Sequence, residues 1–318
     1  MDNQTTDNKV KFLQSPIFIT LIALFCCFLW GSATPAIKTG SHLLIPQNHV
    51  PSTMLFAGIR FFFAGILTVV IFSIARRKFL YPKLHNLGRV GILSCFQTII
   101  QYIFFYVGLS LTSGVKGTIL SGTATFFSIL ISCFLFRMER FNTKKLVACI
   151  LGLVGIVIIN LNGLKPEVNW GDAFVIFSAI SLAVSSTLIK IFSKHEDPVT
   201  LSGYQFILGG AVMIVIGLVS GGKISFKSTT GVIILIYLAF LSAIAYSLWG
   251  MLLKFNPVSK VTVFSFTTPI FGTVLSLLIL TSEKPNVGVV NIIITLALVS
   301  FGILLLNYQK QSKNKDLK

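Results

Sequence analysis

One cationic side chain, Arg60, lies inside an otherwise apolar stretch of the chain. It is the ninth residue of a stretch that begins near residue 52, about 12 Å along a helix axis. An arginine at that depth in a membrane costs at least ~2.5–3.5 kcal/mol and is a functional residue by default. Its guanidinium could bind a carboxylate through two parallel hydrogen bonds. The alternative is a structural arginine that caps carbonyl groups of a neighbouring helix.

Aromatic and polar side chains in other apolar stretches could line a pocket for the same ligand. With Arg60, the candidate substrate-binding residues are Trp30, Ser32, Tyr102, Tyr106, Tyr204, Gln205, Tyr246 and Trp249. Tyr102 and Tyr106 are four residues apart and therefore share one helix face. Membership of the interfacial aromatic belt is the alternative, although Tyr246 and Trp249 lie near the middle of their stretch.

Glycine and proline residues predict two places where a helix is interrupted. Trp30, Gly31, Ser32 and Pro35 form one of these places, and Pro269 after two threonines forms the other. Such residues free backbone groups, which is tolerated where a cavity or another helix supplies partners. We interpret Gly31, Pro35 and Pro269 as candidate hinges, with simple packing kinks as the alternative.

The sequence lacks the residue clusters that other chemistries need. All nine acidic residues lie in tails, loops or helix ends, so no buried carboxylate is placed to relay protons, which favours uniport or exchange. The five cysteines and four histidines show no metal-ligand spacing. No Walker motif is present, so we expect no ATP hydrolysis by this chain. We therefore expect no enzyme activity, no metal and no cofactor.

Ten apolar stretches are long enough to position these residues across a membrane. Apolar residues make up 54% of the chain, charged residues 11%, and the mean hydropathy is +0.87. A membrane helix needs about 20 apolar residues. The predicted helices cover 17–38, 52–74, 88–110, 115–136, 146–163, 171–192, 199–219, 231–253, 258–281 and 288–307. The first is read as a membrane helix, because no small-residue cleavage site follows it.

The second half of the chain repeats the first. Residues 114–139 and 258–283 share seven identities in 26 positions at an offset of 144, and Arg60 aligns with Gln205 at an offset of 145. The predicted organisation is a tail (1–16), two five-helix halves (17–163 and 171–307) and a second, basic tail (308–318). Because five is odd, the second half must enter the membrane upside down. Inverted repeats usually place a substrate site near the midplane.

The basic residues predict orientation rather than nucleic-acid binding. The net charge is +17, but the cations lie in short clusters between apolar stretches and form no recognition motif. With the amino terminus inside, 19 Lys and Arg residues fall on the inner side and six on the outer side. The positive-inside rule then places both termini in the cytoplasm. We expect a multi-pass protein of a bacterial-type inner membrane.

Several motifs, taken in order, resemble one transporter family. They are Leu29-Trp30-Gly31-Ser32 with Lys38, FAGIRFFFAGIL at 56–67, SLTSGVKGT at 110–118, Glu139, and a glycine-rich helix ending at Asn160. Together they resemble the EamA-type members of the drug/metabolite transporter (DMT) superfamily. The resemblance implies an all-α membrane protein of ten helices in two inverted EamA repeats, and export or exchange of small metabolites such as amino acids. Thr125 and Leu182 depart from the family pattern, which usually shows Pro and Trp there.

The sequence therefore predicts a secondary transporter of small organic metabolites, plausibly amino acids or related carboxylates, that works by alternating access around a midplane cavity. The expected partners are that small-molecule substrate and the lipid bilayer, and a homodimer is left open. A channel-like facilitator is the first alternative. An integral-membrane enzyme is the second, although the reactive cluster it would need is missing from the sequence.

Overall fold

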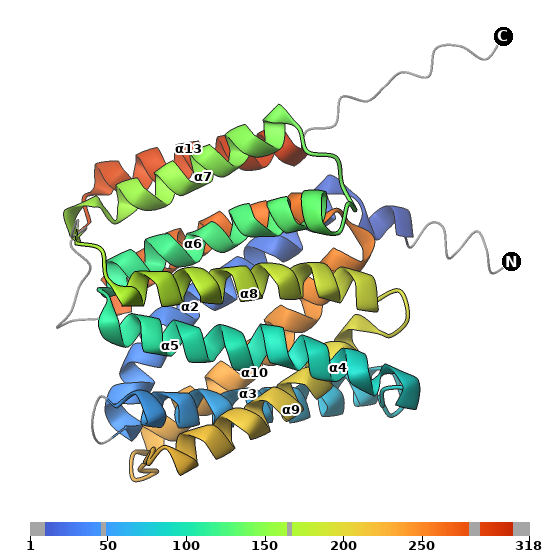
Figure 1. The fold of residues 1–318 in the computed structure, drawn as a ribbon, viewed down its shortest axis with the longest axis vertical. Coiled ribbons are helices and arrows are strands. Elements are labelled where there is room, and N and C mark those ends of the chain that lie inside the picture. Colours follow the sequence, from blue (N-terminus) through green and yellow to red (C-terminus); the bar gives the residue numbers. More distant parts are fainter. Residues whose placement is uncertain (1–9, 46–48, 164–166, 280–286, 308–318) are drawn as a thin grey trace, which may run out of the picture.

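The chain forms a bundle of long apolar helices that run across the view of Figure 1. The structure is a computed structural model and describes residues 10–45, 49–163, 167–279 and 287–307. Within these residues, nine helices are long and apolar enough to cross a membrane. One further apolar helix, α7 (Thr143–Ile159), has 17 residues.

The helices in the first half follow the predicted stretches within a few residues. They are α2 (Pro16–Leu44), α3 (Val50–Ala75), α4 (Leu87–Ser94), α5 (Gln101–Leu111), α6 (Gly114–Leu130) and α7. A π-helix, η2 (Cys95–Ile100), joins α4 to α5, so the continuous span is Leu84–Leu111 and includes the 3-10 turn η1 (Leu84–Asn86). A second π-helix, η3 (Ile131–Leu135), ends the span of α6, and the 3-10 turn η4 (Leu161–Gly163) follows α7.

The second half has the same order of spans. They are α8 (Trp170–Phe192), α9 (Pro198–Val219), α10 (Thr229–Phe255), then α11 (Val258–Thr262) with η5 (Val263–Thr267) and α12 (Thr268–Ile279), and finally α13 (Val289–Asn307). The 3-10 segment η5 interrupts the span and ends two residues before Pro269, close to the interruption that the sequence predicts. The predicted interruption at Trp30–Pro35 is wrong, because α2 continues through Gly31 and Pro35 as one helix.

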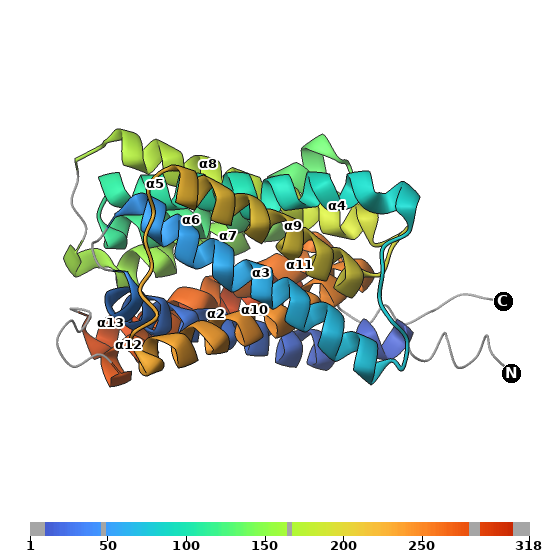
Figure 2. The ribbon, with the colours of Figure 1, turned by 90° about the horizontal axis from the view of Figure 1, so that it is seen from below.

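The helices lie in two layers (Figures 1 and 2). One layer has the order α7, α6, α8, α5 with α4, and α9. The other layer has the order α13, α12, α2, α10 and α3. Helices α7 and α13 pack together at one edge, and α3 and α9 pack together at the other. Each half therefore contributes its first two helices to the layer that holds the rest of the other half.

The close contact between α3 and α9 depends on glycine. A Cβ atom added to Gly65 would lie 2.5 Å from the carbonyl oxygen of Gly203, and one added to Gly210 would lie 2.4 Å from the backbone nitrogen of Phe62. The pairs Gly58–Gly210 and Gly65–Gly203 show that the two helices run antiparallel. Small residues allow this close approach. In lipid the hydrophobic effect does not drive helices together, so close van der Waals packing stabilises their association instead.

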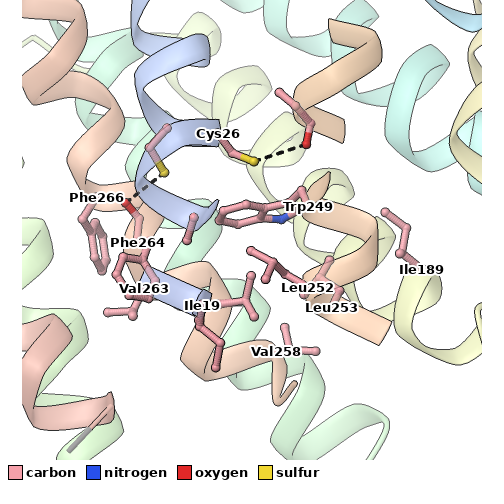
Figure 3. Packing of buried hydrophobic residues seen from close by; sticks show 14 of the residues in the cluster. Ile19, Cys26, Ile189, Trp249, Leu252, Leu253, Val258, Val263, Phe264 and Phe266 are labelled. Carbon is pink, nitrogen blue, oxygen red and sulfur yellow. Dashed lines mark hydrogen bonds between the residues drawn. The ribbon is translucent and has the colours of Figure 1, made fainter. Parts of the chain in front are cut away.

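An apolar core fills the space between α2, α10 and the 3-10 segment η5 (Figure 3). Here the thiol of Cys26 donates to the carbonyl oxygen of Ala245 over 3.5 Å, and Cys27 donates to Phe264 over 3.2 Å. Trp249 and Phe264 are among the buried side chains around them. These cysteines therefore pack as small apolar residues with weak thiol hydrogen bonds.

One end of the bundle holds the start of α2 and the end of α13 (right in Figure 1) and is called the basic end below. The Gln14 side chain donates to the carbonyl of Phe255 over 3.0 Å, and the Asn307 side chain donates to that of Lys260 over 3.5 Å. Glu196 accepts from Asn86 over 2.9 Å and from the backbone of Lys83 over 3.0 Å. Although partial burial acts to raise the pKa of Glu196, these hydrogen bonds lower it overall.

The contact between α3 and α9 predicts the effect of a single methyl group. We expect Gly65→Ala to lower the free energy of unfolding by about 1–3 kcal/mol, because the added carbon meets backbone atoms that side-chain motion cannot clear. Thermal unfolding of the purified protein in detergent measures this change. The matched control is Gly91→Ala in α4, where an added Cβ meets no atom within 4 Å and alanine favours the helix. Equal melting temperatures for the two variants would contradict the proposed role of the contact.

Candidate functional site

Arg60 lies on α3 with only 3% of its surface exposed. Its Nε and Nη2 atoms donate to the Ser242 hydroxyl on α10 over 3.1 and 2.9 Å, and that hydroxyl donates to the carbonyl of Leu238 over 2.8 Å. The guanidinium carbon lies 4.8 Å from the centre of the Phe61 ring. Among the described residues, no carboxylate lies within ion-pair distance of Arg60. The charge is therefore buried with a neutral hydroxyl as its hydrogen-bond partner.

Four aromatic rings beside Arg60 form two equivalent pairs. The rings of Phe61 and Phe206 stack with 5.1 Å between centres and 9° between planes. The hydroxyl oxygens of Tyr102 and Tyr246 are 3.1 Å apart. The ring centre of Phe61 lies 4.5 Å from that of Tyr102, and the ring centre of Phe206 lies 4.8 Å from that of Tyr246. Each residue of the first half thus meets its aligned counterpart in the second half, at offsets of 145 and 144.

Three more of the candidate residues join this group. Trp30 on α2 packs edge-to-face against Tyr246 at 5.2 Å and against Trp249 at 4.9 Å. Tyr106 lies 5.8 Å from Tyr102 and is 8% exposed. The central cluster therefore unites six candidate residues with Phe61 and Phe206; the six are Trp30, Arg60, Tyr102, Tyr106, Tyr246 and Trp249.

Gln205 has the same kind of environment as Arg60. Its Oε1 accepts a hydrogen bond of 2.7 Å from Thr98 in η2, and Thr98 aligns with Ser242 at an offset of 144. The side chains at the aligned positions 60 and 205 therefore make equivalent contacts. Each is hydrogen-bonded to a hydroxyl group, and the residues that carry these hydroxyls, Ser242 and Thr98, are aligned with each other as well. The difference between them is the charge of Arg60.

Sequence reasoning missed several polar residues around the cluster. Gln97, Thr98, Gln101 and Ser242 are buried within spans that read as apolar. Gln97 and Gln101 are four residues apart, and this spacing, with Thr98 between them, is the signal that could have revealed the first three. Gln97 and Thr98 lie in the π-helix η2, a geometry that is frequent at functional sites.

Seven buried polar side-chain atoms of the described residues have no hydrogen-bond partner within the described protein. They are Trp30 Nε1, Ser94 Oγ, Gln97 Oε1, Gln101 Oε1, Gln205 Nε2, Ser247 Oγ and Thr268 Oγ1, and Trp30 belongs to the central cluster. Buried polar groups are nearly always hydrogen-bonded in native proteins, so these atoms require an explanation. Donors and acceptors are both present, as recognition of a small polar molecule would need.

Two candidate residues point away from the central cluster. The hydroxyl of Ser32 donates to the carbonyl of Leu29 over 2.7 Å and lies 2.6 Å from that of Tyr237, whose side chain is 43% exposed. Tyr204 donates to the carbonyl of Leu80 over 3.0 Å, near the basic end. These contacts, and not residue type, separate Ser32 and Tyr204 from the central cluster.

The candidate hinges lie where α2 meets α12. A Cβ added to Gly31 would lie 2.5 Å from that of Phe271 and 2.9 Å from the backbone nitrogen of Gly272. Pro35 is buried within α2, and Pro269 opens α12 after η5. Gly31 thus serves close packing in this state, and the hinge roles stay predictions.

Comparison with known proteins identifies related chains. The model of the EamA-like transporter family matches twice, at residues 17–161 and 169–308. An uncharacterized transporter of Synechocystis sp. is 26% identical over 93% of this chain and 91% of its own length. A chloroplastic WAT1-related protein of Arabidopsis thaliana is 22% identical over 86% of this chain and 66% of its own length. One crystal structure shares the fold, with a TM-score of 0.73 and 18% identity over 90% of this chain and 97% of its own.

The Arg60–Ser242 contact predicts an unequal effect of two serine substitutions on α10. We expect Ser242→Ala to lower the free energy of unfolding by about 1.5–3 kcal/mol, because it removes a hydrogen bond to a buried charge. Ser247→Ala is the matched control, since its buried hydroxyl has no partner and its removal is close to neutral. Chemical denaturation in detergent measures both. A Ser242→Ala variant as stable as Ser247→Ala would contradict this reading of the contact.

Proposed function

Because the chain belongs to the EamA-like transporter family, we propose that it is a secondary transporter that exports or exchanges small organic metabolites bearing a carboxylate, amino acids among them. The observation that carries this proposal is the buried guanidinium of Arg60, which has a neutral hydroxyl as its partner. A substrate carboxylate would supply the missing negative charge through a charge-assisted hydrogen-bonded pair.

The surroundings of Arg60 support a substrate with polar and apolar parts. The rings of Trp30, Tyr102 and Tyr246 offer an apolar wall. The indole nitrogen of Trp30 is a buried donor without a partner, and we propose that the unpartnered amide atoms of Gln97, Gln101 and Gln205 supply further donors and acceptors. Pockets for small ligands combine these two features, with a few polar groups that fix the orientation of the ligand. An amino acid or a related carboxylate has the matching chemistry.

We further propose that the two halves, 17–163 and 171–307, are inverted repeats with ten membrane helices in all, α7 being the fifth. Two observations support this. Aligned helices α3 and α9 pack antiparallel, and so do α7 and α13, where Gly155 meets Thr295 and Gly302 meets Ala148. Aligned residues also make equivalent contacts, as in Arg60–Ser242 and Gln205–Thr98.

The burial of the cluster supports our proposal of alternating access. Arg60, Gln205, Tyr246 and Trp249 are all less than 10% exposed, so a substrate reaches them only when helices separate. Contacts between the halves hold each end of the bundle. Lys116 binds Asp172 at one end, and Glu139 accepts from the Ser259 backbone over 3.3 Å at the basic end. If the bundle opened toward one side of the membrane, the contact between the halves at that end would have to break.

The proposed orientation places the basic end in the cytoplasm of a bacterial-type cell. Cations of the α3–α4 loop, the α6–α7 turn and the α10–α11 turn lie at this end, among them Arg77, Arg140 and Lys254. The positive-inside rule assigns such loops to the cytoplasm.

Transport by the purified protein in liposomes tests this function. We expect saturable uptake of a labelled amino acid that does not depend on a pH gradient, because no described carboxylate lies beside Arg60 to relay protons. Arg60→Gln places the residue of position 205 at position 60 and keeps a donor for Ser242. Its apparent affinity is expected to fall on the order of 10- to 100-fold.

Arg60→Lys is the matched control, because it keeps the charge and is expected to keep most of the uptake. If Arg60→Gln transported as well as the wild type, the carboxylate would not bind at this residue. Uptake that required a pH gradient would contradict the uniport or exchange mode, and flux that never saturated would favour a channel.

A further inference from the structure

Two adjoining cavities lie at the basic end, outside the central cluster. The larger one, about 640 Å³, lies beneath the turn between α6 and α7 and is lined by residues 133–134 and 137–141. The smaller one, about 390 Å³, continues from it toward Lys260 and the last turns of α13. Glu139 and Arg140 line both. The two cavities therefore form one groove that crosses from the first half of the chain to the second.

Most of the side-chain charge around this groove is positive and unpaired. Arg137, Arg140, Lys144 and Lys260 line it, and none of them has a carboxylate within ion-pair distance among the described residues. The single acidic residue in the lining is Glu139. Four cations that face one groove without counter-charge are a site for an anion with several oxygen acceptors.

The carboxylate of Glu139 does not neutralise these four cations, because it is already bound by Lys145 and Ser259. Lys145 donates to its Oε2 over 2.8 Å, and both the hydroxyl and the backbone nitrogen of Ser259 donate to the same carboxylate. Burial raises the pKa of Glu139, but these hydrogen bonds outweigh burial and hold the pKa below its usual value. The charges of Glu139 and Lys145 thus neutralise each other, and the positive charges of the four other cations are left without a counter-charge.

Apolar side chains border the same groove. Phe134 and Phe141 line the larger cavity and are 60% and 37% exposed, and Leu305 and Leu306 line the smaller one. Phe134 belongs to the membrane span 114–135, so its exposed ring faces lipid chains. The groove therefore lies where the apolar surface of the bundle meets its cationic end, at the level of lipid headgroups.

We propose that this groove binds one anionic phospholipid, with its phosphate held by Arg137, Arg140, Lys144 and Lys260 and its acyl chains along Phe134, Phe141 and the end of α13. The combination of unpaired cations with exposed apolar rings selects an amphiphile over a free phosphate ion. Basic pockets between membrane helices are known to bind anionic headgroups. Because η3, α7, α11 and α13 all contribute, the lipid would link the two halves at this end.

Native mass spectrometry of the full-length protein in neutral detergent tests the site. The probes are palmitoyl-oleoyl phosphatidylglycerol, the zwitterionic phosphatidylcholine with the same chains, and inorganic phosphate. We expect the wild type to bind one phosphatidylglycerol more tightly than phosphatidylcholine, and phosphate not to displace it. The double variant Arg137→Gln, Arg140→Gln is expected to bind phosphatidylglycerol on the order of tenfold more weakly.

The matched control is Arg77→Gln, Lys78→Gln, which removes the same charge from an exposed loop at the same end of the bundle. Arg77 also shares the left-handed backbone of Arg137, with φ of 51° and 49°. The control and an Arg137→Lys, Arg140→Lys variant are expected to bind like the wild type. Unchanged phosphatidylglycerol binding by the double glutamine variant would overturn the site. Displacement by inorganic phosphate, or equal binding of phosphatidylcholine, would overturn the lipid as its ligand.

Discussion

The antiparallel packing of α3 against α9 is the constraint on which the central cluster depends. Glycines bring the two backbones so close that a Cβ added to Gly58, Gly65 or Gly210 would clash with backbone atoms of the other helix. With the backbones in that position, Phe61 stacks on Phe206, and the helices on either side bring the Tyr102 and Tyr246 hydroxyls together. In lipid, where apolar side chains gain little from leaving their solvent, such close packing is a main source of helix association.

The packing also places Arg60 and Gln205 in matching environments, and their difference gives the cluster its chemistry. Each contacts a hydroxyl, Ser242 for Arg60 and Thr98 for Gln205. The Thr98 hydroxyl binds the Oε1 of Gln205 and leaves its neutral Nε2 without a partner. The Ser242 hydroxyl, by contrast, leaves the guanidinium of Arg60 with its full positive charge in a medium of low dielectric constant. A bound anion would relieve that charge, whereas the Gln205 side carries none. The electrostatic asymmetry between the two positions thus rests on one side chain.

Much of the fold was predictable from the sequence, and the reasons are physical. The length of each apolar stretch reflects the thickness of the membrane, so the predicted spans agree with the helices within a few residues at most ends. The π-helix η2 was not predictable in this way, because its sequence CFQTII contains neither glycine nor proline. At η5 the sequence predicted an interruption near Pro269 but not its 3-10 geometry. The expected break in α2 was wrong, since a proline removes one backbone hydrogen bond but the rest of the helix persists.

The site was predictable only in part. Residue type identified Arg60, Tyr102 and Tyr246, because polar groups at that depth stand out against an apolar background. The direction in which each side chain points was harder to infer. Tyr204 and Gln205 are neighbours in the chain, yet one contacts Leu80 and the other Thr98, since successive residues on a helix point about 100° apart. Ser242 escaped notice because a lone serine in a membrane helix usually serves packing.

The single charge of Arg60 has an electrical consequence. Two identical halves around a two-fold axis can hold only an even number of charges at equivalent positions, whereas two joined halves with different residues at 60 and 205 hold one. Under the proposed function, the site would be cationic when empty and neutral when a monocarboxylate is bound. The membrane voltage would then act on the return of the empty carrier, by up to about 2.3 kcal/mol per 100 mV, and would leave the loaded step almost untouched.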